Sequence, residues 1–194
     1  MSNTWDIWRG EKVRLRGWEP DDWQHDQRWL RDSEGARASG WIHLPESEAA
    51  LRKHTEETAL RGHSQTEDAY NFIVETLSGE AVGTIAGVDC DRINGTLGYA
   101  LYIGIEARRN GYAFEAVLLL ARYYFFERRY QKLNAGVYAF NDASARLQEK
   151  LGLQLEGRSR RGVFTNGTHH DVLHFGITAE EFLERHAAWL KRNC

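Results

Sequence analysis

The order of segments along the chain predicts an α+β fold with a mixed, mostly antiparallel central sheet. Three strand-like segments lie between Tyr70 and Ile103, separated by the turn sequences Ser78-Gly79-Glu80 and Asn94-Gly95. Short turns of this kind between apolar runs are typical of antiparallel hairpins. One strand–helix–strand unit follows, from Thr96 to Phe140. A length of 194 residues with no linker-like segment predicts one domain, residues 1–194, with a core of about 12–178.

The first third of the chain is predicted to hold one strand and two helices. Lys12 to Trp18 alternates apolar and polar residues, as a half-buried strand does. The proline and acidic residues that follow are typical of a helix start and predict a helix from Asp22 to Arg31. A second helix is expected from Glu46 or Ser47 to about Leu60. We expect the glycine-containing segment between them, Asp32 to Leu44, to be a loop with a functional role.

The rest of the chain alternates strands and helices. A helix from about Gly111 to Arg128 carries apolar side chains at helical spacings. Thr178 and Glu181 form a capping-box pattern, which predicts a C-terminal helix over residues 179–192. The remaining elements are expected to be strands at Tyr70 to Leu77, Ala81 to Asp89, Thr96 to Ile103, Leu133 to Phe140, Gln154 to Arg161 and Asp171 to Ile177, with a helix at Ala143 to Leu151.

The composition is that of an ordinary globular protein. Hydrophobic residues make up 42% and charged residues 27%, and the net charge of −3 provides no basic field for nucleic acid. The longest apolar run, Ala116 to Ala121, is far shorter than the roughly 20 residues that a membrane span needs. The first residues show no secretory signal pattern, so a cytoplasmic location is expected. No metal site is expected, because the two cysteines lack ligand spacing and His169 and His170 point to opposite faces of a strand.

A candidate phosphate-binding loop lies between the strand that ends at Ile103 and the helix after it. Its sequence is Arg108-Arg109-Asn110-Gly111-Tyr112-Ala113. The N–H groups and the dipole at a helix N-terminus bind phosphate, and a glycine lets a pyrophosphate approach the backbone closely. The same pattern also fits a simple turn that caps a helix.

Two motifs give the chain a family resemblance. The segment from Leu101 to Ala113 resembles the acetyl-CoA-binding motif of the GCN5-related N-acetyltransferases (GNAT), a strand followed by (Gln/Arg)-x-x-Gly-x-(Gly/Ala) and a helix. Asn141-Asp142-Ala143-Ser144, with Lys150-Leu151-Gly152-Leu153 after it, is similar to the signature of the ribosomal-protein, RimJ/RimL-like branch. The resemblance covers about Lys12 to Thr178, nearly the whole chain.

The resemblance implies a GNAT fold, in which a V-shaped cleft splits the sheet. The cleft would lie between Thr96 to Ile103 and Leu133 to Phe140, and the pantetheine of acetyl-CoA would lie in it like an extra strand. Backbone groups of Leu101, Tyr102 and Ile103 would bind pantetheine and polarise the thioester carbonyl. The pyrophosphate would be held by the loop residues Arg108, Arg109, Asn110, Gly111, Tyr112 and Ala113.

The resemblance also implies site roles for Asn141 and Ser144. Other branches place a tyrosine acid seven residues after the asparagine, and here that position is Gln148, which is no acid. Ser144 is therefore expected to donate a proton or hydrogen bond to the leaving sulfur, although a serine also suits a first helical turn. Asn141 is expected to cap the helix or to hold pantetheine and a water. Gly136 stands where the branch often has a glutamate base, so the base is unassigned. A water chain could deliver the unprotonated amine, or a carboxylate such as Asp89, Asp91 or Glu75 could serve instead.

These features imply an acetyl-CoA-dependent N-acetyltransferase that works in a ternary complex and needs no metal. The acceptor is expected to enter beside Asp32 to Leu44, the second helix and the hairpin from Arg161 to Asp171. Three acceptor classes remain open: a protein or peptide N-terminus, a small amine such as an antibiotic, and a polyamine. Six of the seven tryptophans lie in the first 41 residues and favour a partly apolar acceptor or a partner surface, although core packing also explains them.

A different hypothesis is a non-catalytic acyl-CoA-binding sensor or interaction module, because the base is missing and Gln148 replaces the tyrosine. Substitution of Ser144 and Asn141 separates the two, since an enzyme would lose turnover and keep its affinity for CoA. No nucleic-acid or membrane partner is expected. A homodimer is expected by analogy with the family.

Overall fold

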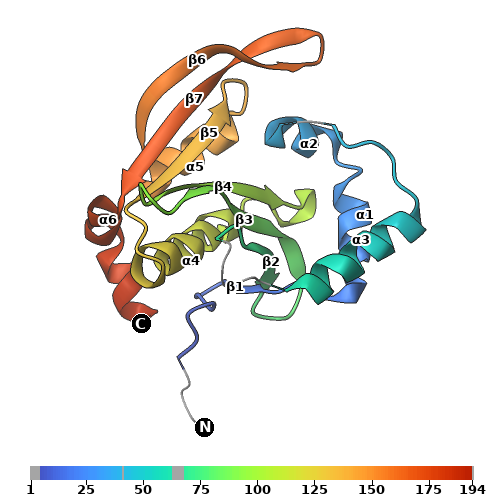
Figure 1. Ribbon diagram of the computed structural model, residues 1–194, viewed down its shortest axis with the longest axis horizontal. Coiled ribbons are helices and arrows are strands. Elements are labelled where there is room, and N and C mark those ends of the chain that lie inside the picture. The colour runs from blue at the N-terminus through green and yellow to red at the C-terminus, as the bar shows by residue number, and fades with distance from the viewer. Residues whose placement is uncertain (1–4, 41, 63–67, 194) are drawn as a thin grey trace.

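The computed structural model, which describes residues 5–40, 42–62 and 68–193, is built around one central sheet. Its seven strands have the order β1-β2-β3-β4-β5-β7-β6 (Figure 1). Neighbouring strands run antiparallel, except β4 and β5, which are parallel. The predicted α+β fold with a mixed sheet is therefore confirmed. The strands are β1 (Val13–Arg16), β2 (Asn71–Thr76), β3 (Ala81–Asp91), β4 (Thr96–Ile103), β5 (Lys132–Tyr138), β6 (Gln154–Thr165) and β7 (Thr168–Thr178).

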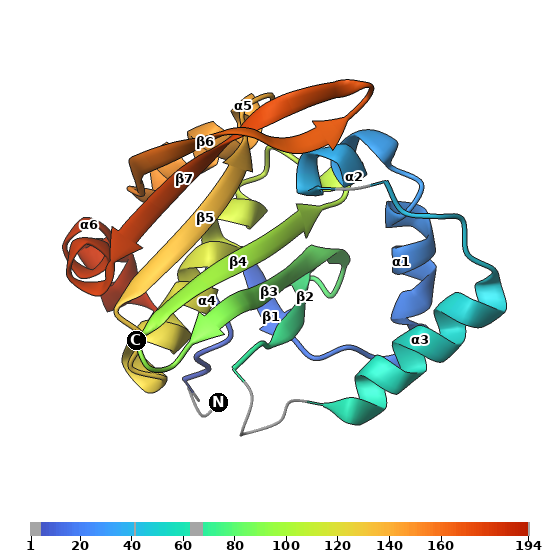
Figure 2. The ribbon, with the colours of Figure 1, turned by 45° about the horizontal axis from the view of Figure 1, so that its top comes forward.

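Helices flank this sheet on both faces. α4 lies against the face that carries the main core, and α1 packs on the other face, where Trp29 contacts Ile73 and Ala81 (Figure 2). None of the helices in the described ranges is long and apolar enough to cross a membrane. The helices are α1 (Trp23–Trp29), α2 (Ser33–Ser39), α3 (Glu48–Arg61), α4 (Tyr112–Glu127), α5 (Asp142–Leu151) and α6 (Ala179–Arg192), with 3-10 turns η1 (Pro20–Asp22) and η2 (Ile105–Ala107).

α4 supplies the centre of the main core. Its residues from Ala116 to Ala121 are almost completely buried. They belong to one cluster with inward side chains of the strands, among them Val74, Ile85, Leu97 and Leu133. Burial on most sides explains why this helix is apolar around most of its circumference.

The ends of several helices follow their predicted caps. Ser47 accepts a hydrogen bond from the Ala50 N–H at 3.2 Å and starts α3. Thr178 and Glu181 exchange the two hydrogen bonds of a capping box at the start of α6. Gly111, in a left-handed conformation, precedes α4. Local side-chain chemistry therefore sets these boundaries.

Two predictions from the sequence are wrong: one concerns the segment after α1, the other the length of the last hairpin. The segment from Asp32 to Leu44 is not a plain loop, because it contains the short helix α2, whose cap is Asp32. Gly35 and Gly40 conceal this helix in the sequence, since glycine disfavours helices. The last hairpin is longer than predicted and extends to Thr165 and Thr168. Its far end is largely exposed on both faces, so no apolar alternation marks it.

β4 and β5 separate after a short parallel contact. They pair only from Thr96 with Lys132 to Gly98 with Asn134, whereas β5 stays paired with β7 along its whole length. Beyond Gly98, the edge of β4 that faces β5 has no strand partner among the described residues. Figure 2 shows the two strands diverging from this point. The predicted V-shaped opening is therefore confirmed.

Candidate active site

The loop before α4 has the conformation of a helix start that can bind an anion. Gly111 has φ +84° and Arg109 has φ +68°, both in the left-handed region. The first N–H groups of α4 have no acceptor within the helix, so they and the helix dipole are available to a ligand. The Lys12 ammonium donates to the Asn110 carbonyl at 2.9 Å and adds positive charge. This geometry suits a phosphate group at Arg109 to Ala113.

The guanidinium of Arg108 has a different use. Its Nε donates to the Ile103 carbonyl at 3.0 Å, and its other end forms an ion pair with Asp32, the cap of α2. The side chain therefore ties the end of β4 to α2. Only the backbone of Arg108 remains for the phosphate role that the sequence suggests.

Asp32 collects hydrogen bonds from three elements. Besides Arg108, it accepts one from the Gly35 N–H at 2.9 Å and one from the Tyr102 hydroxyl at 3.0 Å. Burial acts to raise the pKa of Asp32, but these donors outweigh it and hold the pKa below its usual range. A Cβ at Gly35 would overlap with Asp32 and lie 2.8 Å from Arg108 Nη2, so glycine allows these groups to converge.

Replacing Asp32 with alanine is expected to lower the free energy of unfolding by about 1–2 kcal/mol, because α2 loses its cap. Ser47→Ala removes the exposed cap of α3 and serves as the matched control. Its cost should stay at the low end of the range for caps, about 0.5 kcal/mol, since no ion pair is lost with it. Urea unfolding measures both. Equal losses in the two variants would contradict the role of the Asp32–Arg108 contact.

The start of α5 lies beside the open end of the cleft. Asn141 caps the helix by accepting from the Ser144 N–H at 3.0 Å, and its Nδ2 donates to the Ala38 carbonyl of α2 at 3.2 Å. α2 therefore bridges the end of β4, through Asp32, and the start of α5, through Asn141. Ser144 is half-buried, and its hydroxyl lies 3.4 Å from Nε2 of Gln148.

The predicted pantetheine-binding residues lie on β4 beyond the point where it leaves β5. Leu101, Tyr102 and Ile103 pair with β3 through one backbone edge and face the cleft with the other. The side chains of Leu101 and Ile103 join the core on the α4 side, and that of Tyr102 packs with α1 and α2. The Ile103 carbonyl already accepts from Arg108, so the remaining backbone groups on the cleft edge are the part available to a ligand.

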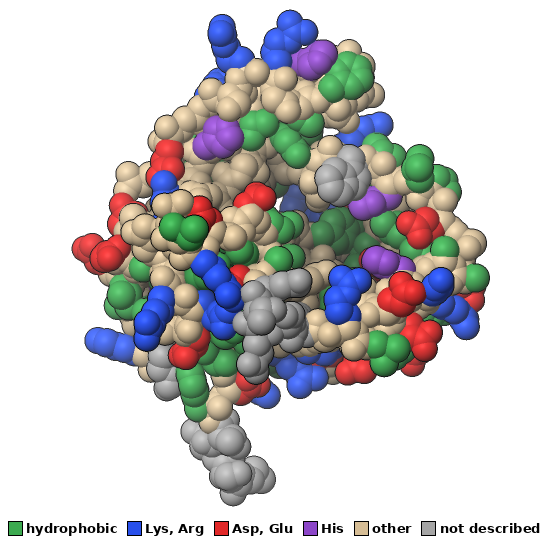
Figure 3. All heavy atoms as spheres, viewed as in Figure 1, with side chains coloured by type: hydrophobic (Ala, Val, Ile, Leu, Met, Phe, Trp, Pro, Cys, Tyr) green, Lys and Arg blue, Asp and Glu red, His purple; other side chains and the backbone are tan. Residues whose placement is uncertain are grey.

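A cavity of about 330 Å³ lies between α1, α2, α3 and the ends of β3 and β4. Figure 3 shows this hollow, with hydrophobic side chains inside it. Tyr102 and Thr84, which pair across β3 and β4, contribute to its wall, so the cavity adjoins the strand that borders the cleft. Its lining residues are Trp18, Asp26, Trp29, Leu30, Ala36, Ser39, His43, Glu46, Leu51, His54, Thr58, Asn71, Thr84 and Tyr102.

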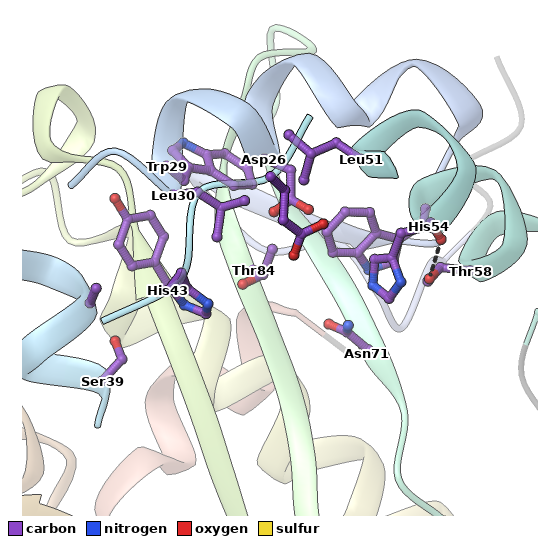
Figure 4. A pocket seen from close by; sticks show the side chains of 14 residues that line it. Asp26, Trp29, Leu30, Ser39, His43, Leu51, His54, Thr58, Asn71 and Thr84 are labelled. Carbon is purple, nitrogen blue, oxygen red and sulfur yellow. Dashed lines mark hydrogen bonds between the residues drawn. The ribbon is translucent and has the colours of Figure 1, made fainter. Parts of the chain in front are cut away.

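Asp26 of α1 is a half-buried carboxylate in the wall of this cavity. It lies between Trp29 on its own helix and His54 on α3 (Figure 4). Burial raises the pKa of Asp26, while His54 and His43 act in the opposite direction. Sequence patterns did not single out Asp26. The one signal was its position three residues before Trp29, which places the two side chains on one face of a helix.

The carboxylates that are candidate bases in the sequence do not lie in the cavity. Glu75 accepts hydrogen bonds from Arg14 and Arg16 at the β1–β2 edge, and Asp91 accepts from N–H groups of the β3–β4 turn. Neither these two nor Asp89 line the cavity. The hairpin from Arg161 to Asp171, expected beside the acceptor, does not line it either.

The N-terminal tryptophans divide between the two expected roles. Trp18 and Trp29 line the cavity. Trp8 packs against Phe72 and Tyr123 instead, and Trp41 lies outside the described residues. Within the described ranges, no three His, Cys, Asp or Glu side chains are grouped so that they could hold a metal ion.

Known proteins resemble this chain over most of its length. A family model described as an acetyltransferase (GNAT) domain matches residues 12–154. The SPbeta prophage-derived uncharacterized N-acetyltransferase YokL of Bacillus subtilis (strain 168) is 38% identical over 183 residues, which cover 92% of this chain and 97% of that protein. The putative ribosomal N-acetyltransferase YdaF of the same strain is 22% identical over 173 residues, covering 89% and 94%. The structure of spermidine N-acetyltransferase from Vibrio cholerae, in complex with CoA and spermine, aligns with a TM-score of 0.74 at 22% identity, over 88% of this chain and 98% of that chain.

Proposed function

Because the chain belongs to the acetyltransferase (GNAT) family and is an N-acetyltransferase, we propose that it acetylates a primary amine of a small, positively charged molecule. The observation that carries this proposal is the cavity beside β4, where Asp26 lies among aromatic side chains. A carboxylate and the faces of aromatic rings both bind a protonated amine. Glu46 lines the same cavity and suits an acceptor with a second charged nitrogen.

The size of the cavity also favours a small acceptor. About 330 Å³ lies at the lower end of the range for small-molecule pockets. α1, α2 and α3 line the space, and its volume suits one small molecule better than several residues of a peptide. The name of the Vibrio cholerae relative, a spermidine N-acetyltransferase, supports the same class of acceptor.

The donor, acetyl-CoA, fits the features on the other side of β4. The unpaired edge of β4 beyond Gly98 offers backbone donors and acceptors to an extended pantetheine arm. The loop from Arg109 to Ala113 offers N–H groups to the pyrophosphate. With the donor in the cleft and the acceptor in the cavity, both would reach β4 near Tyr102, so that direct transfer needs no acyl-enzyme.

The transfer itself requires one new bond and one broken bond. The neutral amine nitrogen attacks the thioester carbon, and N–H groups of Leu101 to Ile103 stabilise the oxyanion that develops. The C–S bond then breaks as the C–N bond remains. The nitrogen loses one proton to solvent, the sulfur takes one proton from the hydroxyl of Ser144, and solvent returns one proton to the Ser144 oxygen, so the serine ends the cycle neutral. Asn141 holds the start of α5, and so Ser144, against α2.

A protein N-terminus is the second candidate acceptor. The Asn141 to Ser144 and Lys150 to Leu153 motifs favour the RimJ/RimL-like branch, and the name of YdaF, a putative ribosomal N-acetyltransferase, supports it. The small volume of the cavity and the carboxylates in its wall favour the small cationic amine over this acceptor. The homodimer expected by analogy stays a prediction that gel filtration tests.

An assay of free CoA release from acetyl-CoA distinguishes these acceptors. The panel contains diamines and polyamines, amine-bearing antibiotics, and peptides with varied N-termini. We expect thiol release with a small cationic amine and none with the peptides. Release with peptides alone would contradict the small-molecule acceptor and leave the second candidate.

Replacing Asp26 with asparagine should raise the KM for the cationic amine about tenfold, the effect of losing one charge-assisted hydrogen bond. The KM for acetyl-CoA should stay unchanged, because Asp26 is not in the cleft. Glu56→Gln is the matched control, since it removes a negative charge from the exposed side of the neighbouring helix α3. Equal effects of the two substitutions would show a long-range charge effect and exclude Asp26 as a contact of the amine.

A further inference from the structure

We propose that Tyr99 and Gln148 orient the hydroxyl of Ser144, so that its proton is directed toward the cleft. The inference rests on the proposed function, in which Ser144 serves the leaving sulfur. Ser144 would be the catalytic residue, and Tyr99 and Gln148 would be positioning residues. Their contacts join β4 to the first turns of α5.

Gln148 is the middle member of this chain of side chains. It is only 2% exposed, and its Oε1 accepts a hydrogen bond from the Tyr99 hydroxyl at 2.7 Å. Its Nε2 lies 3.4 Å from Ser144 Oγ, a long hydrogen bond. Gln148 and Ser144 are one helical turn apart on α5, so they share a face of the helix. That face is turned toward β4, because it carries the contact with Tyr99.

The chemistry of an amide fixes the direction of these bonds. An amide accepts with its oxygen and donates with its nitrogen. Burial raises the pKa of Tyr99 above the ordinary value of a phenol, so the ring keeps its proton at neutral pH and can donate it. The tyrosine thereby holds Oε1 toward itself and leaves Nε2 facing Ser144. The serine oxygen then accepts, and its own proton is left for another acceptor.

This arrangement accounts for glutamine at a position where related branches are expected to have a tyrosine acid. A glutamine has no proton to give, but it can set the direction in which a neighbouring hydroxyl gives one. If the amide rotated by half a turn, Oε1 would face Ser144 and accept the hydrogen bond of its hydroxyl. The Tyr99 hydroxyl disfavours that rotation, because it would lose its acceptor while buried.

Tyr99→Phe is the first test, since it keeps the ring and removes the donor. The amide can then rotate, so kcat is expected to fall by about three- to tenfold, the effect of one ordinary hydrogen bond. The KM for acetyl-CoA should not change. Tyr130→Phe is the matched control: it also removes a buried hydroxyl, here one bonded to Asp68 at 2.8 Å, and kcat should be retained. An unchanged kcat in Tyr99→Phe would overturn the proposal.

Gln148→Glu supplies a second test with a pH readout. The introduced carboxylate can only accept, so the Ser144 hydroxyl would donate its hydrogen bond to it and not to the sulfur, which lowers kcat toward the level of Ser144→Ala. When the buried carboxyl is protonated, it again has one accepting and one donating oxygen. The kcat relative to wild type should therefore rise as the pH falls. A ratio that is independent of pH would overturn the proposal, because a purely structural role has no reason to titrate.

Ser144→Ala separates this inference from the proposed function. We expect it to lower kcat about tenfold, a modest effect because a thiolate is a good leaving group even without an acid. A wild-type enzyme that turns over, together with a fully active Ser144→Ala, would overturn the inference and leave the transferase in place. Absence of turnover in the wild type with every amine would overturn both. If Gln148→Glu does not fold, as judged by circular dichroism, Tyr99→Phe decides alone.

Discussion

Replacing Asp68 with asparagine is expected to lower the free energy of unfolding by about 3 kcal/mol. The Asp68 side chain is buried and accepts hydrogen bonds from Arg92, Arg128 and the Tyr130 hydroxyl. Removing the charge of a buried carboxylate from its cationic partners costs about 3–5 kcal/mol. We expect the lower end of that range, because half of the Arg92 side chain is exposed and stays hydrated.

The position of Asp68 explains why so many groups meet there. Its backbone carbonyl accepts from the Tyr124 hydroxyl of α4 and from the Cys90 thiol of β3. Its side chain binds Arg128 and Tyr130, which lie in the connection from α4 to β5. Asp68 therefore holds the base of the opening, close to where β4 and β5 are paired. Loss of the Asp68 carboxylate should therefore destabilise the fold.

The stability difference between wild type and Asp68→Asn should depend on pH. Hydrogen bonds from Arg92, Tyr130 and Arg128 outweigh burial and hold the pKa of Asp68 far below its usual range. The carboxylate therefore stabilises the folded state fully above the unfolded-state pKa of about 4, and this contribution is lost as the pH falls further. The difference should be constant from neutral pH down to about 5 and shrink below about 4.

Urea unfolding at several pH values measures this difference. Glu48→Gln is the control, because the Glu48–Arg52 pair of α3 is exposed and should contribute no more than about 0.5 kcal/mol. A pH-independent difference for Asp68→Asn would show that packing around the side chain, and not its charge, stabilises the cluster.

The sequence predicted most of the fold because local chemistry decides most of it. The turn at Asn94-Gly95, the capping box at Thr178 and the apolar run in α4 each specify their element from a few residues. α2 escaped prediction because its stability comes from long-range contacts. Its cap, Asp32, is bonded to Arg108, far away in the sequence. No local pattern reports such a pairing.

The candidate site divides in the same way. The half that is proposed to bind acetyl-CoA, the donor half, could be predicted. It consists of a strand, a glycine-containing loop and a helix that follow one another in the sequence. The acceptor cavity could not, because each of the six elements α1, α2, α3, β2, β3 and β4 contributes only one to three residues to it. Asp26 has no motif around it, and its chemistry depends on the burial that the assembled helices create. The Tyr99–Gln148 contact likewise joins two elements that only the tertiary fold brings together.

The donor half can be tested at one glycine. Gly111→Val is expected to raise the Kd for acetyl-CoA at least about 100-fold. At φ +84° a β-branched side chain is strained, so the backbone before α4 should move. If two charge-assisted hydrogen bonds to the pyrophosphate are lost, at about 1.5–3 kcal/mol each, the Kd rises by that factor or more.

Gly79→Val is the matched control for strain alone. Gly79 lies in the β2–β3 turn with φ +91°, and a Cβ there would meet nothing within 4 Å. Both variants should lose stability from the left-handed backbone, but Gly79→Val should bind acetyl-CoA as the wild type does. Isothermal titration calorimetry measures both. Equal affinities for acetyl-CoA in the two variants would show that the loop before α4 does not bind the donor.

A truncated donor makes the test specific for the phosphate. S-acetylpantetheine has the thioester and the pantetheine arm but no pyrophosphate, so it should bypass the loop at Gly111. We expect Gly111→Val to leave kcat/KM for this donor unchanged while kcat/KM for acetyl-CoA falls about 100-fold, in line with the lost binding energy. If both donors lost activity equally, the substitution would act through β4 and the cleft. The helix start would then position the strand and would not bind the donor.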